Sequence, residues 1–100
     1  MKSITAAALK EKIDHAEDIQ LIDVREPYEH EEFNIGGQLI PLNEITQQLA
    51  AINKDKPVIF YCRKGIRSQV AIQRLHEKFP FTNLFNLMGG TEAWKKEFEV

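Results

Sequence analysis

A chain of 100 residues is long enough for one modest core and too short for two ordinary domains, so we expect a single domain over residues 1–100. Hydrophobic content of 43% and charged content of 28% are typical of a globular protein and exclude a disordered chain. A net charge of −2 gives no basic field for nucleic acid, and no apolar run has the length of a signal peptide core or a membrane span. We therefore expect a cytoplasmic protein without nucleic-acid or membrane partners.

The chain contains one cysteine, Cys62, and three histidines. A single cysteine excludes an internal disulfide, and the histidines have no ligand spacing to it or to each other. The sequence therefore predicts no metal site, and it gives no sign of a cofactor. Cys62 is either a core side chain or a reactive thiol.

The first 57 residues alternate short apolar runs with helical patterns. Apolar runs with β-branched residues predict strands at 2–4, 20–24 and 38–41. Apolar residues at helical spacing, or a proline followed by acidic residues, predict helices over 6–15, 26–33 and 43–52. Thr5 and Asn43 are suited to cap the first and third of these helices.

The second half continues the alternation. Apolar runs predict strands at 58–62 and 84–87. Ser68 is expected to open a helix that ends before Pro80, and Thr91 is expected to cap a last helix that contains Trp94. Strands that alternate with helices at this pitch predict an α/β fold, with a small parallel sheet and helices on both faces.

Two charged residues, Asp23 and Arg25, interrupt the apolar run at the end of the strand over 20–24. In open α/β sheets, binding sites are built in the crevice at the carboxyl ends of the strands. These residues are therefore expected near a site, although a purely structural ion pair between them is an equal alternative.

Cys62 ends the strand over 58–62 and is followed by a basic loop. A thiol placed before a helix lies near the positive end of the helix dipole, and Arg63, Lys64 and Arg67 add three cations. Both effects favour the reactive thiolate. Gly65 lets the loop adopt a conformation in which successive N–H groups turn inward and bind an anion.

A cysteine that ends an apolar strand is often only a buried core side chain. Core cysteines do not usually adjoin three cations and a glycine, so the loop as a whole favours a functional Cys62. Arg63 and Lys64 are expected on the surface. Arg67 is expected directly before the helix, folded back over the loop.

The loop over 62–68 resembles that of rhodanese-type sulfurtransferases, which runs Cys, two residues, Gly, one residue, Arg, then Ser or Thr. Residues 21–26 resemble the acidic-basic strand end of that family, and residues 86–94 resemble its closing Gly-Gly-x-x-Ala-Trp segment. The chain therefore resembles a single rhodanese-like (thiosulfate sulfurtransferase) domain. It departs from the pattern at 33–38, where the family commonly reads Gly-His-Ile-Pro-Gly-Ala, and we expect a structural turn there.

The resemblance implies an open parallel five-stranded sheet and a reaction without a cofactor. Cys62 would take a sulfane sulfur from a donor such as thiosulfate and become a persulfide. Because the chain has no second cysteine to resolve the persulfide, an external acceptor must discharge it. Cyanide, a small thiol, thioredoxin or another sulfur-accepting protein would each serve.

The resemblance also assigns roles by position. The residues after Cys62 would bind the donor, namely Arg63, Lys64, Gly65, Ile66 and Arg67. Three further residues would brace the loop, namely Asp23, Arg25 and Ser68. Gly89 and Gly90 are expected to form a turn, and Trp94 is expected in the core.

Two other function classes remain open. One is a cysteine phosphatase or arsenate reductase. Cysteine phosphatases of the related cell-cycle type have five residues between cysteine and arginine, whereas this chain has four. The shorter loop suits a single sulfur atom better than a phosphoryl group. A non-catalytic rhodanese-like binding module is the other alternative, although such domains typically lack the cysteine that this chain keeps.

Overall fold

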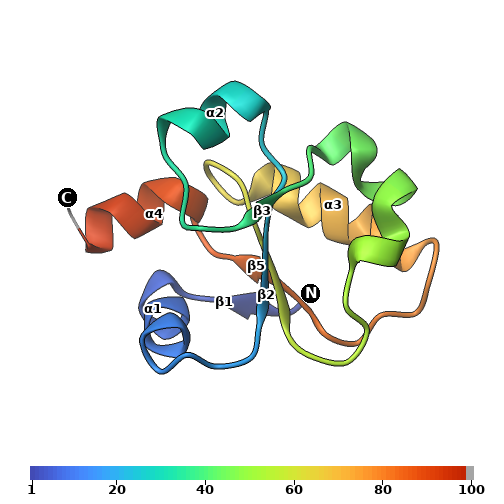
Figure 1. The fold of residues 1–100 in the computed structure, drawn as a ribbon, viewed down its shortest axis with the longest axis horizontal. Coiled ribbons are helices and arrows are strands. Elements are labelled where there is room, and N and C mark those ends of the chain that lie inside the picture. Colours follow the sequence, from blue (N-terminus) through green and yellow to red (C-terminus); the bar gives the residue numbers. More distant parts are fainter. Residues whose placement is uncertain (99–100) are drawn as a thin grey trace.

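The computed structural model describes residues 1–98 and contains one parallel sheet of five strands (Figure 1). The strands are β1 (Ser3–Ile4), β2 (Gln20–Asp23), β3 (Gln38–Leu39), β4 (Val58–Tyr61) and β5 (Leu84–Leu87). Their order across the sheet is β1-β5-β4-β2-β3, and every neighbouring pair is parallel. Each strand lies within the run predicted for it, which confirms the parallel five-stranded sheet.

Strand β4 is the centre of the sheet. It pairs with β2 over four residues, from Gln20 opposite Val58 to Asp23 opposite Tyr61, and with β5 on its other side. All four β4 residues are buried, as expected for a parallel strand covered on both faces. Cys62 follows directly, so its thiol lies at the middle of the carboxyl edge of the sheet.

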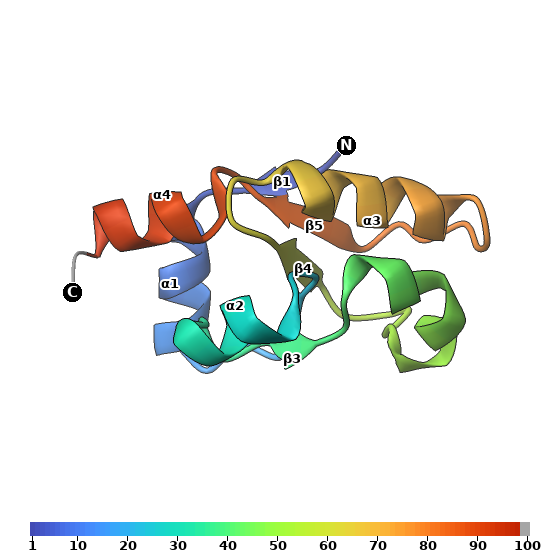
Figure 2. The same ribbon diagram turned by 90° about the horizontal axis from the view of Figure 1, so that it is seen from above.

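Helices cover both faces of the sheet, as predicted (Figures 1 and 2). They are α1 (Ala6–Asp14), α2 (Pro27–Glu32), the 3-10 helix η1 (Leu42–Ala51), α3 (Ile66–His76) and α4 (Gly90–Glu97). One core cluster packs η1 and α3 on β2 and β4, and a second packs α1 and α4 on the opposite face. The remaining helix, α2, lies at the carboxyl edge near β3 and buries none of its residues.

The starts of two helices differ from the prediction. Helix α3 begins at Ile66 rather than Ser68, because Gly65 adopts a left-handed conformation (φ 95°) and caps it. Helix α4 begins at Gly90 rather than after Thr91, because Gly89 is left-handed (φ 74°) and serves as the cap. Glycine adopts positive φ without steric cost, so it can start a helix where no side-chain cap is present.

The capping predictions for the first half had opposite outcomes. Thr5 caps α1 as predicted, since its Oγ1 accepts a hydrogen bond of 3.1 Å from the backbone N–H of Ala8. The prediction that Asn43 caps the third helix is wrong. The η1 helix begins at Leu42 after Pro41, is of the 3-10 type and is kinked at Gln48.

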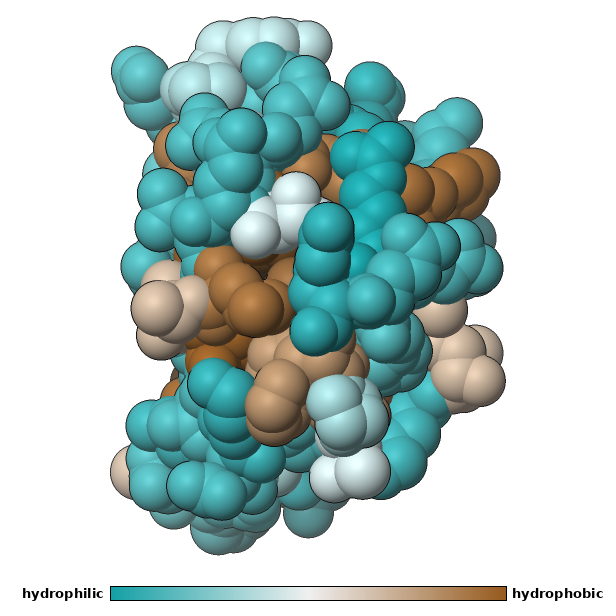
Figure 3. Space-filling view, turned by 90° about the vertical axis from the view of Figure 1, so that its right-hand side faces the viewer, coloured by the Kyte–Doolittle hydropathy of each residue, from teal (hydrophilic) through white to brown (hydrophobic). Residues whose placement is uncertain are grey.

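Figure 3 views the end of the molecule formed by η1 and the last turn of α3. Hydrophobic side chains gather at its centre among hydrophilic ones. Leu49 on η1 and Phe79 after α3 are partly buried and pack against the core, and the Lys54 ammonium lies 5.0 Å from the centre of the Phe79 ring. Leu49 and Phe79 therefore lie at the edge of the hydrophobic core. No helix within residues 1–98 has the length and apolar character needed to cross a membrane.

Replacing Ile72 by alanine should lower the free energy of unfolding by about 2–5 kcal/mol, because the fully buried side chain packs against the sheet and its loss leaves a cavity. Urea unfolding of the variant measures this loss. The control is Gln73→Ala, the next residue on α3, which is exposed and should change stability by less than about 0.5 kcal/mol. Equal losses in both variants would contradict the packing of Ile72 against the sheet.

Candidate active site

The thiol of Cys62 lies inside the loop that joins β4 to α3 and is almost fully buried, at 1% exposure. Its Sγ accepts hydrogen bonds from the backbone N–H of Gly65 at 3.1 Å and of Ser68 at 3.4 Å. Backbone donors aimed at one atom form a nest for negative charge, and the start of α3 contributes one of the two. The loop therefore directs two backbone N–H donors at the Cys62 sulfur.

Gly65 gives the loop its shape. Its φ of 95° is disfavoured for other residues, and a Cβ at this position would lie 3.2 Å from the backbone nitrogen of Gly89. The Cys62 loop therefore packs directly against the turn that follows β5. The glycine spacing in the sequence indicated the conformation but not this contact.

Ser68 and Asn86 form a buried polar pair behind the thiol. The Ser68 hydroxyl lies 3.4 Å from the Cys62 sulfur and donates a hydrogen bond to the Asn86 side-chain oxygen. Sequence reasoning placed Ser68 in the loop but missed Asn86, which lies on β5 and is buried. The available signal was a polar residue in the otherwise apolar run 84–87.

The first turn of α4 supports the loop from the opposite side. The backbone N–H groups of Thr91 and Glu92 donate to the carbonyl oxygens of Cys62 (2.9 Å) and Arg63 (3.1 Å). Gly90 has a φ of 57°, and a Cβ there would lie 2.2 Å from the Cys62 carbonyl oxygen. Besides forming a turn, Gly90 therefore lets two backbone segments approach closely.

Two of the three loop cations pair with glutamates. Arg63 is largely exposed and its Nε lies 3.1 Å from Glu92. Arg67 lies in the first turn of α3, not before it, and its guanidinium forms two hydrogen bonds with Glu29 on α2, at 2.7 and 2.9 Å. The guanidinium of Arg67 is therefore anchored to α2, and Arg67 also lines the cavity beside Cys62. Within residues 1–98, Lys64 makes no ion pair.

The Glu29–Arg67 pair changes the titration of its carboxyl group. Hydrogen bonds from Arg67 are the main cause that lowers the pKa of Glu29 from 4.5 to about 2. The same bonds raise the pKa of Arg67. Because Glu29 stays ionised at neutral pH, it neutralises the charge of Arg67, one of the three loop cations.

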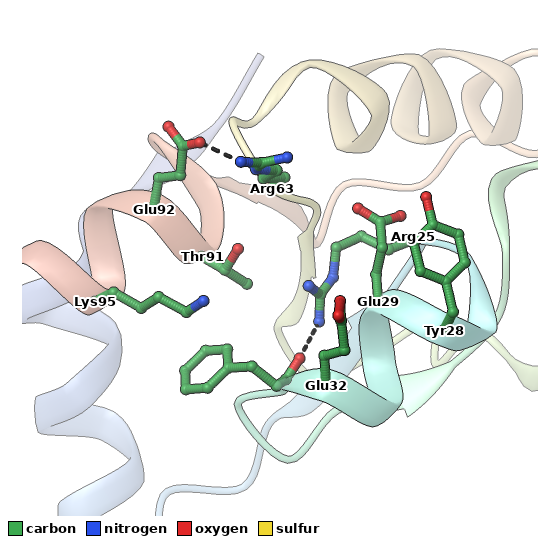
Figure 4. A pocket seen from close by; sticks show the side chains of 9 residues that line it. Arg25, Tyr28, Glu29, Glu32, Arg63, Thr91, Glu92 and Lys95 are labelled. Carbon is green, nitrogen blue, oxygen red and sulfur yellow. Dashed lines mark hydrogen bonds and ion pairs between the residues drawn. The ribbon is translucent and has the colours of Figure 1, made fainter. Parts of the chain in front are cut away.

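Asp23 and Arg25 form a buried ion pair at the end of β2. The Arg25 Nη2 lies 2.8 Å from Asp23 Oδ2 and also donates to the carbonyl oxygen of Phe33 (Figure 4). The His30 Nδ1 lies 2.9 Å from the same Asp23 oxygen. These contacts attach α2 to the sheet, and in the described chain neither residue makes a hydrogen bond to the loop over 62–68.

Two cavities open at this edge of the sheet. A cavity of about 150 Å³ is lined by Cys62, Arg63, Lys64, Ile66 and Arg67. A larger cavity of about 450 Å³ lies between α2 and α4 (Figure 4). Residues 1–98 contain no group of three or more cysteine, histidine or carboxylate side chains that could hold a metal ion. The site thus joins a cradled sulfur to a small pocket with cationic side chains.

The chain matches the family model "Rhodanese-like domain" over residues 5–97, and it belongs to this family. The YtwF protein of Bacillus subtilis (strain 168) is 40% identical over 98 residues, which are 97% of this chain and 93% of that protein. Thiosulfate sulfurtransferase GlpE of Coxiella burnetii (strain RSA 331 / Henzerling II) is 37% identical over 79 residues, covering 78% of this chain and 73% of that protein. A crystal structure of a rhodanese-like domain protein from Staphylococcus aureus aligns with a TM-score of 0.84 and 32% identity, covering 94% and 91% of the two chains.

Replacing Gly90 by alanine should lower the free energy of unfolding by about 2–5 kcal/mol, because the new Cβ overlaps the Cys62 carbonyl and the backbone is left-handed. The matched control is Gly36→Ala. Gly36 is also left-handed but has no atom within 4 Å of its Cβ position, so this variant should lose only about 1–2 kcal/mol. The Gly90 variant alone should also change the rate of Cys62 alkylation by iodoacetamide. Equal effects of both substitutions would contradict the close approach.

The Glu29–Arg67 pair predicts a pH-dependent stability. The folded-state pKa of Glu29, about 2, lies below the ordinary 4.5, so its contribution is present above about pH 4.5 and is lost as the pH falls toward 2. The stability difference between the wild type and Glu29→Gln should therefore narrow over that range in urea unfolding. The difference in the free energy of unfolding should be small, because Arg67 is partly exposed and solvent screens the ion pair. Glu31→Gln, an exposed neighbour on the same helix, should show no such narrowing.

Proposed function

We propose that this protein transfers a sulfane sulfur from an anionic donor of the thiosulfate type to a thiophilic acceptor, with Cys62 as the nucleophile. The observation that carries the proposal is the Cys62 sulfur held by the Gly65 and Ser68 N–H groups at the floor of the small cavity. A nest of backbone donors supports a sulfur anion without any metal or cofactor.

In the first step, the Cys62 thiolate attacks the outer sulfur of thiosulfate. A new S–S bond forms at Sγ, the S–S bond of thiosulfate breaks, and sulfite leaves with the electron pair. Cys62 then bears a persulfide whose terminal sulfur is anionic. The cavity of about 150 Å³, which the loop residues line, has room for that sulfur.

In the second step, an acceptor nucleophile attacks the terminal sulfur and the electron pair returns to Sγ. Cyanide would leave as thiocyanate, and a thiol would leave as its own persulfide. The transferred sulfur atom keeps the same oxidation state from donor to acceptor, so the cycle needs no external oxidant. Residues 1–98 provide no second thiol, which makes the acceptor an external molecule.

The cations of the small cavity have different roles in this proposal. Lys64, which makes no ion pair within residues 1–98, attracts the anionic donor most strongly. Arg63 and Arg67 form ion pairs with Glu92 and Glu29. They therefore contribute less to the positive potential of the pocket than to its shape. Ile66, 67% exposed, forms an apolar part of the rim, and Ser68 positions the thiol together with Asn86.

Support for the reaction class also comes from relatives with sulfurtransferase names, among them the thiosulfate sulfurtransferase GlpE. The four residues between Cys62 and Arg67 favour a sulfur atom over a phosphoryl group. The cradled thiol favours an enzyme over a binding module.

Intact-mass spectrometry after incubation with thiosulfate tests the proposal. The wild type should gain the mass of one sulfur atom, which cyanide or a thiol removes, while Cys62→Ser should gain nothing. If thiosulfate, mercaptopyruvate and polysulfide all leave the mass unchanged, sulfur transfer is excluded and a binding module is favoured. Hydrolysis of an aryl phosphate that depends on Cys62 would instead identify a phosphatase.

A further inference from the structure

The Ser68 hydroxyl lies between two groups that compete for its proton. Its Oγ is 3.4 Å from the Cys62 sulfur and donates a hydrogen bond to Oδ1 of Asn86 on β5. All three residues are almost fully buried, with at most 3% exposed, so bulk water does not replace these bonds. A hydroxyl has one proton, and Ser68 can therefore donate to the amide oxygen or to the sulfur, but not to both.

The protonation state of Cys62 decides which arrangement is favourable. A neutral thiol can donate its proton to the Ser68 oxygen, which still has lone pairs while its own proton is bonded to Asn86. A thiolate has only lone pairs, and each donor directed at it stabilises it. The sulfur already accepts from the N–H groups of Gly65 and Ser68, so the Ser68 hydroxyl would be its third donor.

Asn86 opposes this third hydrogen bond. If the Ser68 hydroxyl turned to the sulfur, the amide oxygen of Asn86 would lose the bond that satisfies it in the interior. Leaving a buried acceptor without a partner costs at least as much free energy as a typical hydrogen bond contributes. The backbone of Asn86 is fixed as well, because β5 pairs there with β4 on one side and with β1 on the other. The amide oxygen therefore stays in place and keeps the proton.

We propose that Asn86 is a positioning residue that controls the reactivity of Cys62 by holding the Ser68 proton away from the sulfur. Asn86 thereby limits the fraction of Cys62 that is ionised at a given pH. Each thiolate that forms is more nucleophilic in return, since thiolate nucleophilicity falls as the acidity of the thiol rises. The inference deepens the proposed function, because it names a residue that governs the nucleophile, but its test needs no sulfur transfer.

Replacing Asn86 leaves the charges around the thiol unchanged. Charged side chains at this edge of the sheet come from β2, α2, α4 and the loop into α3, namely Asp23, Arg25, Glu29, Glu92, Arg63, Lys64 and Arg67. Asn86 itself is uncharged. A changed ionisation of Cys62 in an Asn86 variant therefore reports a change in hydrogen bonding rather than a change in charge.

The pH dependence of alkylation by iodoacetamide tests the proposal, because the thiolate is the form of Cys62 that reacts. Asn86→Leu removes the acceptor, so the Ser68 hydroxyl should turn to the sulfur. The midpoint of the pH profile should fall by about one unit, as expected for one added hydrogen bond to a charged group, and the rate constant at high pH should fall about threefold. Asn86→Val also lacks the acceptor and replaces the leucine variant if that variant does not fold.

Two controls show whether the effect passes through the hydroxyl. In a Ser68→Ala background, replacing Asn86 by leucine should leave the midpoint unchanged, since no hydroxyl remains to turn. Asn83→Leu is the matched buried substitution. Asn83 precedes β5, at the end away from the thiol, is 8% exposed, and donates to the carbonyl oxygens of Asn53 and Lys56. Its replacement should lower stability without moving the alkylation midpoint.

The outcomes separate this proposal from the proposed function. An unchanged or higher midpoint in Asn86→Leu overturns the role of Asn86. An equal shift in Asn83→Leu, or a shift that persists without the Ser68 hydroxyl, overturns it as well. If the wild type forms no persulfide with any donor while the alkylation profiles change as expected, only the proposed function fails.

Discussion

The contact between the Cys62 loop and the first turn of α4 is the constraint on which the site depends. Peptide N–H and C=O groups point in opposite directions, so a loop that turns its N–H groups toward a sulfur must send carbonyl groups elsewhere. Here the carbonyl oxygens of Cys62 and Arg63 accept hydrogen bonds from the N–H groups of Thr91 and Glu92. The N–H groups at the start of α4 thus satisfy the carbonyl groups of the loop, while the N–H groups of the loop face the thiol.

Local patterns were sufficient to predict much of this arrangement. The apolar runs located all five strands, and the cysteine at the end of the central one placed the thiol at the carboxyl edge. The starts of α3 and α4 were misplaced because left-handed glycines cap them, and a glycine in sequence does not reveal the sign of its φ. A resemblance to rhodanese-type sequences correctly identified the family, since its motifs span most of the chain.

Contacts between residues that lie far apart along the chain could not be predicted from the sequence. Asn86 and Ser68 meet across the β5–α3 packing, and Glu29 and Arg67 meet although they are 38 positions apart. No local spacing encodes such pairs. Their consequence is chemical, because the sequence places three cations in one loop, whereas the structure pairs two of them with carboxylates. The number of cationic residues in a loop overestimates its positive electrostatic potential when carboxylates from other helices pair with them.

Helix α2 has a separate consequence for motion. It buries none of its six residues, and its attachments include Glu29 with Arg67, His30 with Asp23, and the Arg25 contact to the Phe33 carbonyl. An element held by polar contacts rather than by core packing can open locally at a lower free energy than the whole fold. Helix α2, which forms one wall of the larger cavity, is therefore expected to open locally before the sheet does, with hydrogen exchange at its amides while the sheet amides remain protected.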